Sequence, residues 1–525
     1  MPDPIPQTTP ADRWAEAERL YAGRQLDQAE GAYRQLLSAP SHAPVALVRL
    51  SMIAALQGRC RDEAEAAMAA FKARPPVPGV LQVIASRLRG AGESRAMLAC
   101  AIDPVVLESG DAKALAEMGR LLANAHFPRE ALELLERARG SGFIAPTLRF
   151  VIGVCRMYVG EDEVARREFE ALLARIPHHA PSLGTLSRLQ STAAEDEALV
   201  DRIRAALAEL GADHQDAPAL HHALFDLLDR RDRRDEAWAA LEEGMRLRRA
   251  QVEFDDAADQ ALFDYLATLR APAPAGEAGD GPRPVFIVGM PGSGTSLLER
   301  VLGRHEQVAD AGELPDFVQQ LRWCCDRAGP PRLDLALARR AEAIDFEELG
   351  IRYLARTWWR GGDRTVYTDR TPSNFTNLSY ILRALPHARI LHVVRSPMDT
   401  CFAGLSDWWW TRADHYSHDQ HQMADRFRRY RALMAHWRAL YPERILDVRY
   451  EELVEDPEKV MAEVLSFCDL PPQQGISDVA GYRGAPAANS DNQRPEPIHA
   501  RDVDRWRRYE QRLQPLRVRL GALAY

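Results

Sequence analysis

Lysine is scarce in this chain of 525 residues: it occurs only at positions 72, 113 and 459, so almost all of the 67 basic residues are arginine. No run of about 18 apolar residues is present, and we therefore expect no membrane-spanning helix. Basic charge is not in excess, because 76 acidic residues give a formal net charge of −9. A dedicated nucleic-acid-binding protein usually carries a basic face, so we expect no nucleic-acid partner.

Cysteine is also infrequent. The seven cysteines are odd in number and form no CxxC pair, which is typical of free thiols in a reducing compartment rather than of disulfides or a zinc site. The N-terminal sequence lacks the basic region and apolar core of a secretory signal. We expect a cytoplasmic protein with a flexible segment at 1–11, and the arginine- and alanine-rich composition indicates a bacterial source.

One phrase recurs through the N-terminal half: a turn, one or two charged residues, then an alanine in an amphipathic helix. The alanines that anchor the phrase are Ala29, Ala64, Ala131, Ala165 and Ala237. They are spaced at one or two periods of about 34 to 36 residues, which is typical of tetratricopeptide repeats (TPRs). We predict an all-α solenoid of TPR-like helical hairpins over 12–270, with a generic helical-hairpin array as the alternative. Such an array binds a peptide or protein partner, or mediates oligomerisation.

The character of the sequence changes after residue 270. Residues 271–284 are rich in Pro, Gly and Ala and predict an extended linker. Beyond it, the apolar runs 284–290, 388–395 and 444–450 have the length of strands and lack polar alternation. Strands of that kind are buried on both faces of a parallel sheet. We therefore predict an α/β domain over 285–525.

A phosphate-binding loop follows the first of these strands. Gly289, Gly294, Thr295 and Ser296 have the spacing of a Walker A motif, but threonine stands where the motif has lysine. The expected ligand contacts are Pro291, Gly292, Ser293, Gly294, Thr295 and Ser296, through backbone N–H groups and hydroxyls. Without the lysine, a nucleoside triphosphate kinase is disfavoured, and a terminal phosphate or a sulfate–phosphate anhydride is favoured. The alternative is a glycine-rich turn with no ligand.

With its flanking blocks, this loop resembles sulfotransferases that use 3′-phosphoadenosine 5′-phosphosulfate (PAPS). The resemblance is carried in order by FIVGMPGSGTSLLERVLGRHEQVADAGEL (286–314), YTDRTPSNF (367–375), PHARILHVVRSPMDTC (386–401), 429–460 and RWRRYEQRLQPL (505–516). The group it most resembles has an N-terminal TPR array and a domain similar to protein-tyrosine sulfotransferase. The resemblance implies a P-loop-like parallel sheet, PAPS as co-substrate, no metal, and a tyrosine, phenol or alcohol hydroxyl as acceptor.

The resemblance also implies catalytic roles for two residues. Glu313 occupies the position of a general base that takes the acceptor's proton. The alternative is a helix N-cap or an acid in a first helical turn, and Asp310 and Asp316 are weaker substitutes for the base. Arg370 stands at the place of a lysine that stabilises charge on the leaving phosphate. Its alternative is a surface salt bridge with Asp369.

Two further residues are expected to contact the donor. Arg395 ends a predicted strand and matches the arginine that binds the 3′-phosphate, with a structural ion pair as the alternative. Ser490 corresponds to a late serine that contacts a donor phosphate. At two positions the sequence departs from the family's pattern: Gly292 replaces an arginine, and Ala403 replaces a serine. Both departures remove donor contacts.

Two side-chain clusters nearby have less specific patterns. Trp408, Trp409 and Trp410 line a pocket or pack a helix onto the core. The histidines in HYSH (415–418) and His421 lack a convincing metal-ligand spacing, and we expect no metal.

With the resemblance, the sequence predicts a PAPS-dependent sulfotransferase. The alternatives are a degenerate transferase domain in a TPR scaffold protein and, less favoured, a nucleotide phosphotransferase.

Overall fold

The protein is described here from a computed structural model that covers residues 9–189, 191–270, 281–407, 412–480, 482 and 497–524. The chain forms two compact units. The first comprises Met1–Cys155, Pro315–Arg332 and Arg340–Asp345, and the second comprises Arg156–Leu314, Leu333–Arg339 and Phe346–Tyr525. The helices of the described part include none that is long and apolar enough to span a bilayer.

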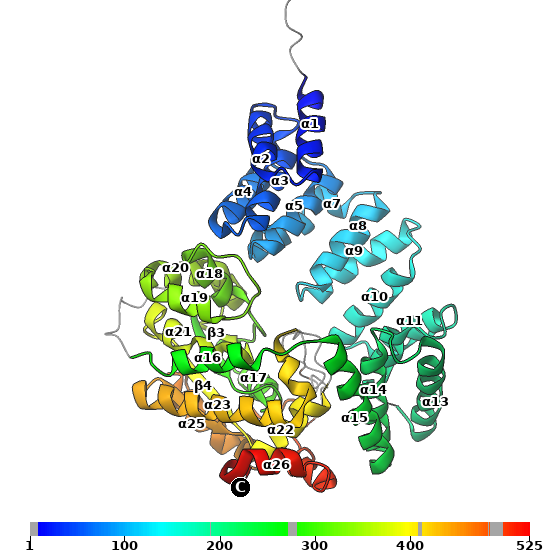
Figure 1. Ribbon diagram of the computed structural model, residues 1–525, viewed down its shortest axis with the longest axis vertical. Coiled ribbons are helices and arrows are strands. Elements are labelled where there is room, and N and C mark those ends of the chain that lie inside the picture. The colour runs from blue at the N-terminus through cyan, green and yellow to red at the C-terminus, as the bar shows by residue number, and fades with distance from the viewer. Residues whose placement is uncertain are drawn as a thin grey trace, which may run out of the picture. The chain divides into compact units, whose positions relative to one another are not determined.

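Helical hairpins form the N-terminal part of the chain, as the repeat predicts (Figure 1). In the first unit they are α1 (Pro10–Ala22), α2 (Leu26–Gln35), α3 (Ala43–Leu56), α4 (Cys60–Lys72), α5 (Pro78–Gly90), α6 (Ser94–Ala101), α7 (Pro104–Leu107), α8 (Ala112–Ala123) and α9 (Pro128–Gly140). Helix α10 (Pro146–Tyr158) is divided between the units. The second unit continues with α11 (Asp162–Leu173), α12 (Ala180–Leu186), α13 (Ala193–Leu210), α14 (Ala217–Arg230), α15 (Arg234–Gln251) and α16 (Asp256–Leu266).

The alanines that define the repeat are packing residues. Ala29, Ala64, Ala131, Ala165 and Ala237 are all buried, each on the second helix of a hairpin. A small side chain at this position allows two helices to approach closely, which explains why alanine recurs with the period of the hairpin. The TPR-like prediction is therefore confirmed.

Helix α1 begins earlier than the sequence pattern suggests. Thr9 and Asp12 form a capping box: the Asp12 N–H donates to the Thr9 hydroxyl, and the Asp12 carboxylate accepts from the Thr9 N–H at 3.0 Å. Residues 10 and 11, expected in the flexible segment, therefore belong to the first helix.

A five-stranded parallel sheet forms the centre of the α/β part, in the order β2-β3-β1-β4-β5. The strands are β1 (Arg283–Val288), β2 (Val308–Ala309), β3 (Val366–Asp369), β4 (Arg389–Val394) and β5 (Ile445–Arg449). The three predicted apolar runs are β1, β4 and β5. Strand β1 begins at Arg283, inside the range expected as linker, and residues 271–280 lie outside the described part.

Helices complete this part of the chain, and the one at 316–324 belongs to the first compact unit. They are α17 (Thr295–Leu302), α18 (Asp316–Cys324), α19 (Leu335–Arg340), α20 (Phe346–Thr357), α21 (Leu378–Ala384), α22 (Pro397–Ser406), α23 (Gln420–Leu440), α24 (Tyr450–Glu455), α25 (Pro457–Phe467) and α26 (Gln514–Leu520). The core packs Leu298 of α17 and Met461 of α25 with Ile287, Leu391 and Val448 of the sheet. This packing fixes the loop between β1 and α17.

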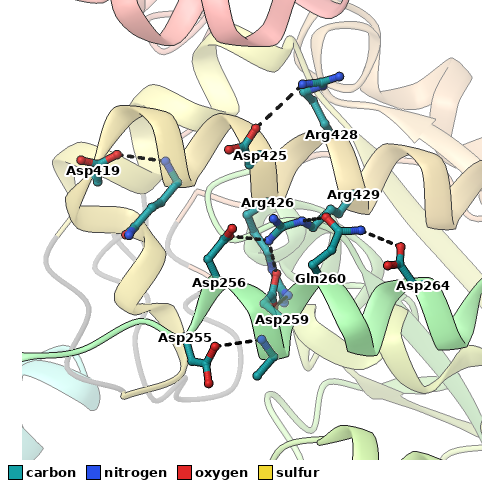
Figure 2. Close-up of polar contacts among 12 residues, drawn as sticks. Asp255, Asp256, Asp259, Gln260, Asp264, Asp419, Asp425, Arg426, Arg428 and Arg429 are labelled. Atoms are coloured by element: carbon teal, nitrogen blue, oxygen red, sulfur yellow. Dashed lines mark hydrogen bonds and ion pairs between the residues drawn. The ribbon is translucent and has the colours of Figure 1, made fainter.

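Helix α16, the last before the linker, is attached to α23 by ion pairs (Figure 2). Arg429 of α23 donates to Asp256 at 2.7 Å and to Asp259 at 2.9 Å, and Arg426 also pairs with Asp259. The Arg429 Nε donates to Gln260 at 2.7 Å. Helix α16 and the α/β part are thus joined by ion pairs as well as by the chain.

Candidate active site

The carboxyl ends of three neighbouring strands meet at one edge of the sheet. Strand β1 runs into the loop 289–294, Arg370 directly follows β3, and Arg395 directly follows β4. Because β3, β1 and β4 are adjacent and parallel, these segments lie side by side. The topology therefore gathers a glycine-rich loop and two arginines that are far apart in the sequence.

The loop has the backbone conformation that its glycines predict. Gly292 has φ +84° and Gly294 has φ +103°, values that glycine adopts without a steric penalty. Gly294 precedes the first residue of α17. The N–H groups of a first helical turn have no acceptor within the helix and attract an anion.

A cavity of about 160 Å³ lies at this edge of the sheet. Among its lining residues are Glu313, Arg370, Arg395 and the loop residues 291–296 other than Ser293. The Ser293 hydroxyl is buried and has no hydrogen-bond partner in the described part of the chain. The structure thus brings most of the expected site residues into one place, while Ser490 and Trp408–Trp410 lie outside the described residues.

Arg370 is a buried cation held between two carboxylates. Its Nε donates to Glu299 at 2.5 Å, and its Nη1 donates to Glu313 at 3.1 Å. Burial by itself lowers the pKa of Arg370, but the two carboxylates outweigh it and hold the pKa above its ordinary value. The alternative of a surface salt bridge with Asp369 is wrong: Arg370 is 1% exposed, and the Asp369 carboxylate accepts from Tyr353 instead, at 3.0 Å.

Glu313 lies in the extended segment between β2 and α18. Helix α18 begins only at Asp316 and its N-cap is Pro315, so the alternative of a helix N-cap or first-turn acid is wrong. The Glu313 side chain keeps 19% of its surface exposed and lines the cavity. It is therefore accessible to a small molecule and lies beside the Arg370 guanidinium.

Glu299 is a buried acidic residue of the site that the sequence did not reveal. Its buried carboxylate accepts from the Gly312 N–H at 3.0 Å, from the Thr368 hydroxyl at 2.6 Å and from Arg370. These bonds tie helix α17, strand β3 and the segment that carries Glu313 together. The only sequence signal is an acidic residue on the apolar face of α17, between Leu298 and Val301.

Arg395 bridges the loop and the C-terminal segment. Its Nη1 donates to the Gly292 carbonyl at 2.8 Å, its Nη2 donates to the Asp502 carbonyl at 2.5 Å, and the guanidinium lies 4.5 Å from the centroid of the Tyr450 ring. Its acceptors are backbone carbonyls. A backbone carbonyl carries no full charge, so an anionic ligand can compete for this guanidinium.

The C-terminal segment 497–505 forms another wall of the cavity, through residues that include His499, Arg501 and Arg505. Asp399 of α22 anchors it by accepting from the Asp504 N–H at 2.8 Å and the Trp506 N–H at 3.2 Å. Burial raises the pKa of Asp399, although Arg395 opposes this effect. Sequence reasoning recognised the block 505–516 but assigned it no site residue.

Arginine supplies every strong cation of the cavity. The lining arginines are Arg300, Arg370, Arg395, Arg501 and Arg505. The planar guanidinium suits bidentate contacts with phosphate and sulfate oxygens, which is consistent with an anionic ligand in a chain that has little lysine. Across the described residues, no three His, Cys, Asp or Glu side chains gather in a way that would hold a metal ion.

Comparison with known proteins finds a family model that matches part of the C-terminal half. Residues 284–474 match the Sulfotransferase family, which supports a transferase of sulfuryl groups. A protein of Aquifex aeolicus (strain VF5), described as uncharacterized, is 27% identical over 307 residues; the match covers 56% of this chain and 40% of that protein. The chain thus spans less than half the length of this relative.

Several solved structures match parts of the chain. The sulfotransferase domain of the Synechococcus PCC 7002 olefin synthase is 19% identical, with a TM-score of 0.32, over 45% of this chain and 91% of that domain. A sulfotransferase from Alicyclobacillus acidocaldarius is 17% identical, with a TM-score of 0.27, over 47% and 96%. A tetratricopeptide repeat protein from Parabacteroides merdae is 14% identical, with a TM-score of 0.34, over 45% and 93%.

Proposed function

We propose that the C-terminal part of this chain, which matches the Sulfotransferase family, transfers a sulfuryl group from PAPS to the hydroxyl of an acceptor. The observation that carries the proposal is the convergence of the loop 289–296, Arg370, Arg395 and Glu313 on one cavity. The first three offer hydrogen-bond donors to an anion. Glu313 is a carboxylate that can take a proton.

A buried donor group supports an oxyanion ligand in the cavity. The Nη2 of Arg370, a residue that lines the cavity, is buried and has no hydrogen-bond partner in the described residues. A buried donor without an acceptor costs about 1–3 kcal/mol, and more when the donor is charged. A phosphate or sulfate oxygen in the cavity would supply acceptors for such donors. The 5′-phosphosulfate end of PAPS therefore fits the loop and Arg370.

We assign Arg395 and the C-terminal segment to the 3′-phosphate of the donor. The Arg395 guanidinium already lies between the loop and residue 502, at the cavity wall. Replacing a neutral carbonyl acceptor by a phosphate makes the hydrogen bond charge-assisted on both sides, and such bonds contribute about 1.5–3 kcal/mol. Arg395 is therefore the residue on which donor affinity should depend most.

In the transfer itself, PAPS supplies a sulfuryl group attached to a phosphate that can leave. The acceptor oxygen attacks sulfur, and its proton passes to the Glu313 carboxylate. The bond from sulfur to the phosphate oxygen breaks with its electron pair on that oxygen, giving a sulfate ester and adenosine 3′,5′-bisphosphate. Arg370, fixed by Glu299, stabilises the charge that develops on the leaving phosphate.

The acceptor class and the cellular setting are part of the same proposal. A tyrosine side chain, a phenol or an alcohol offers the required hydroxyl. The TPR-like array would bind the acceptor or a partner protein, as helical-hairpin arrays do on their concave faces. Seven free cysteines agree with a cytoplasmic location.

Calorimetric titration with adenosine 3′,5′-bisphosphate tests the donor site. We expect the full chain to bind this ligand in preference to ADP and Mg-ATP, and Arg395→Ala to weaken binding about 10- to 150-fold, equivalent to about 1.5–3 kcal/mol. The matched control is Arg389→Ala, at the other end of β4, where Arg389 pairs with Asp469 away from the cavity. The control should bind as the wild type does.

The other outcomes separate the alternatives. Preferential, magnesium-dependent binding of ATP would indicate a phosphotransferase. Absence of binding to all three nucleotides would indicate a scaffold protein with a degenerate transferase domain. If the bisphosphate binds, an acceptor screen with PAPS should show turnover that Glu313→Gln abolishes while bisphosphate binding remains.

A further inference from the structure

The last helical hairpin, α14 and α15, packs against the walls of the cavity. Phe225 of α14 lies edge-to-face with Phe402, a cavity residue of α22, at 6.2 Å between ring centroids. Tyr509 packs against Phe225 at 5.9 Å and against Trp238 of α15 at 5.6 Å. All of these residues belong to the second compact unit. A hairpin expected to serve only as a binding module thus forms a layer directly behind the cavity.

Asp229, near the end of α14, makes the hydrogen bonds and ion pairs of this contact. Its carboxylate is 4% exposed and accepts hydrogen bonds from the Arg505 Nη2 at 2.8 Å and from the Tyr509 hydroxyl at 2.7 Å. It also forms an ion pair with the Arg508 Nη1 at 3.1 Å. These three partners all belong to the C-terminal segment. Asp229 therefore fixes residues 505–509 to the hairpin.

Arg505 lies between Asp229 and the cavity. It lines the cavity, and its guanidinium is 5.6 Å from the centroid of the Phe402 ring and 5.9 Å from that of Phe225. Burial lowers the pKa of Arg505, but the carboxylate of Asp229, followed by those of Asp226 and Asp407, outweighs burial and holds the pKa above its ordinary value. The side chain is consequently a charged wall residue whose position depends on an aspartate of the repeat region.

We propose that Asp229 is a positioning residue for Arg505, and that the α14–α15 hairpin is therefore a structural component of the anion-binding cavity. The proposal rests on the proposed function, in which that cavity binds a bisphosphate nucleotide. It gives the repeat array a direct effect on donor affinity, because a shift of α14 moves Asp229 and with it Arg505. A partner that displaces this hairpin would change donor binding without touching the cavity.

The test is the affinity of the full chain for adenosine 3′,5′-bisphosphate in Asp229→Asn. Asparagine keeps the size of the side chain but removes the charge that holds Arg505, and we expect binding to weaken at least 10-fold. The matched control is Asp232→Asn: Asp232 follows the same helix and pairs with Arg508 and Arg234, but it is 65% exposed and makes no contact with Arg505. The control should bind as the wild type does.

A second variant separates positioning from general loss of packing. Tyr509→Phe removes another hydrogen bond of Asp229 and leaves the pair with Arg505, so it should lower stability with little effect on affinity. In a double-mutant cycle, Asp229→Asn should have little further effect once Arg505 is replaced by alanine. A structural role alone would give additive losses in that cycle.

The outcomes are distinct. No bisphosphate binding by the wild type would overturn the proposed function, and this inference with it. Wild-type binding together with unchanged affinity in Asp229→Asn would overturn the inference alone. Additive effects in the cycle, or an equal loss of affinity in Tyr509→Phe, would also overturn it.

Discussion

Gly292 of the phosphate loop faces Ala403 of helix α22 so closely that a Cβ atom at position 292 would lie 2.8 Å from the Ala403 Cβ. These are the two positions at which the sequence departs from the pattern of the sulfotransferases it resembles. The structure shows that they are neighbours. The two departures therefore form a single packing feature, in which small residues on both sides allow α22 to approach the loop.

Gly292→Ala should lower the free energy of unfolding by about 2–4 kcal/mol. About 1 kcal/mol comes from the left-handed backbone conformation and about 1–3 kcal/mol from overpacking against Ala403. The matched control is Gly362→Ala, because Gly362 also has a positive φ, +58°, but no atom within 4 Å of an added Cβ. Urea unfolding should show a larger loss for Gly292→Ala, and Ala403→Gly should recover part of it. Equal losses at the two glycines would contradict the close contact.

Substitution of Glu299 should cause one of the largest losses in free energy of unfolding in the chain. Glu299→Gln keeps acceptors for the Gly312 N–H and the Thr368 hydroxyl but leaves the buried Arg370 with Glu313 as its only carboxylate. Removing one partner of a buried ion pair costs about 3–5 kcal/mol. Thr368→Val removes no charge but loses the hydrogen bonds of the hydroxyl to the Glu299 carboxylate and from the Ala311 N–H, and it should cost about 1.5–3 kcal/mol. Chemical denaturation of the two variants would measure this difference, and similar losses would show that the charge of Glu299 is unimportant.

A helix or strand could be predicted from the sequence wherever the pattern of its own residues was sufficient. The alanine period predicts the helical hairpins, and the apolar runs predict β1, β4 and β5. Strand β3 was missed because its residues, VYTD, include two polar side chains that are fully buried. Thr368 and Asp369 are compatible with a buried strand because partners that include Glu299 and Tyr353 satisfy their hydrogen bonds. The residues next to Thr368 and Asp369 in the sequence do not identify these two partners.

The same limit applies to the site. Arg395 could be anticipated because it ends a predicted strand and parallel strands end at one edge of a sheet. Arg370 follows strand β3, which was missed, so only the family resemblance identified it. Glu299 and Asp229 could not be anticipated, because each acts through arginines that are 71 and 276 residues away in the sequence. On a helix, an isolated acid next to apolar residues is compatible with many environments. Only the fold identifies the arginine that each acid holds.

The ion pairs between α16 and α23 should differ in energy with their burial (Figure 2). The side chain of Asp259 is 11% exposed and pairs with both Arg426 and Arg429, whereas that of Asp256 is 48% exposed and pairs with Arg429 alone. Asp259→Ala should therefore lower the free energy of unfolding by about 3–5 kcal/mol, because it leaves buried guanidinium groups without this partner. Asp256→Ala, on the same helix, should cost no more than about 1 kcal/mol. Comparable urea midpoints for the two variants would argue against a buried charge network at this contact.

His222 should make the stability of the second unit depend on pH. Burial lowers the pKa of His222 to about 4, and its Nδ1 lies 3.0 Å from the Ser406 carbonyl. In the unfolded chain the pKa returns to about 6.5, so between pH 6.5 and 4 the unfolded state binds the proton that the folded state does not. Stability should therefore fall as the pH falls through this window, by up to about 3 kcal/mol from this residue, and should be regained at neutral pH.

The His222→Asn variant isolates this contribution from that of the other acid-sensitive groups. Asparagine can still donate a hydrogen bond to the Ser406 carbonyl but does not titrate, so the loss of stability between pH 7 and pH 4.5 should be smaller than in the wild type. His421→Asn, at an exposed histidine of α23, serves as the control and should follow the wild type. Urea unfolding of the three proteins at both pH values measures the loss of stability of each on acidification. If His222→Asn loses as much stability on acidification as the wild type, proton uptake by His222 does not drive the acid sensitivity of this contact.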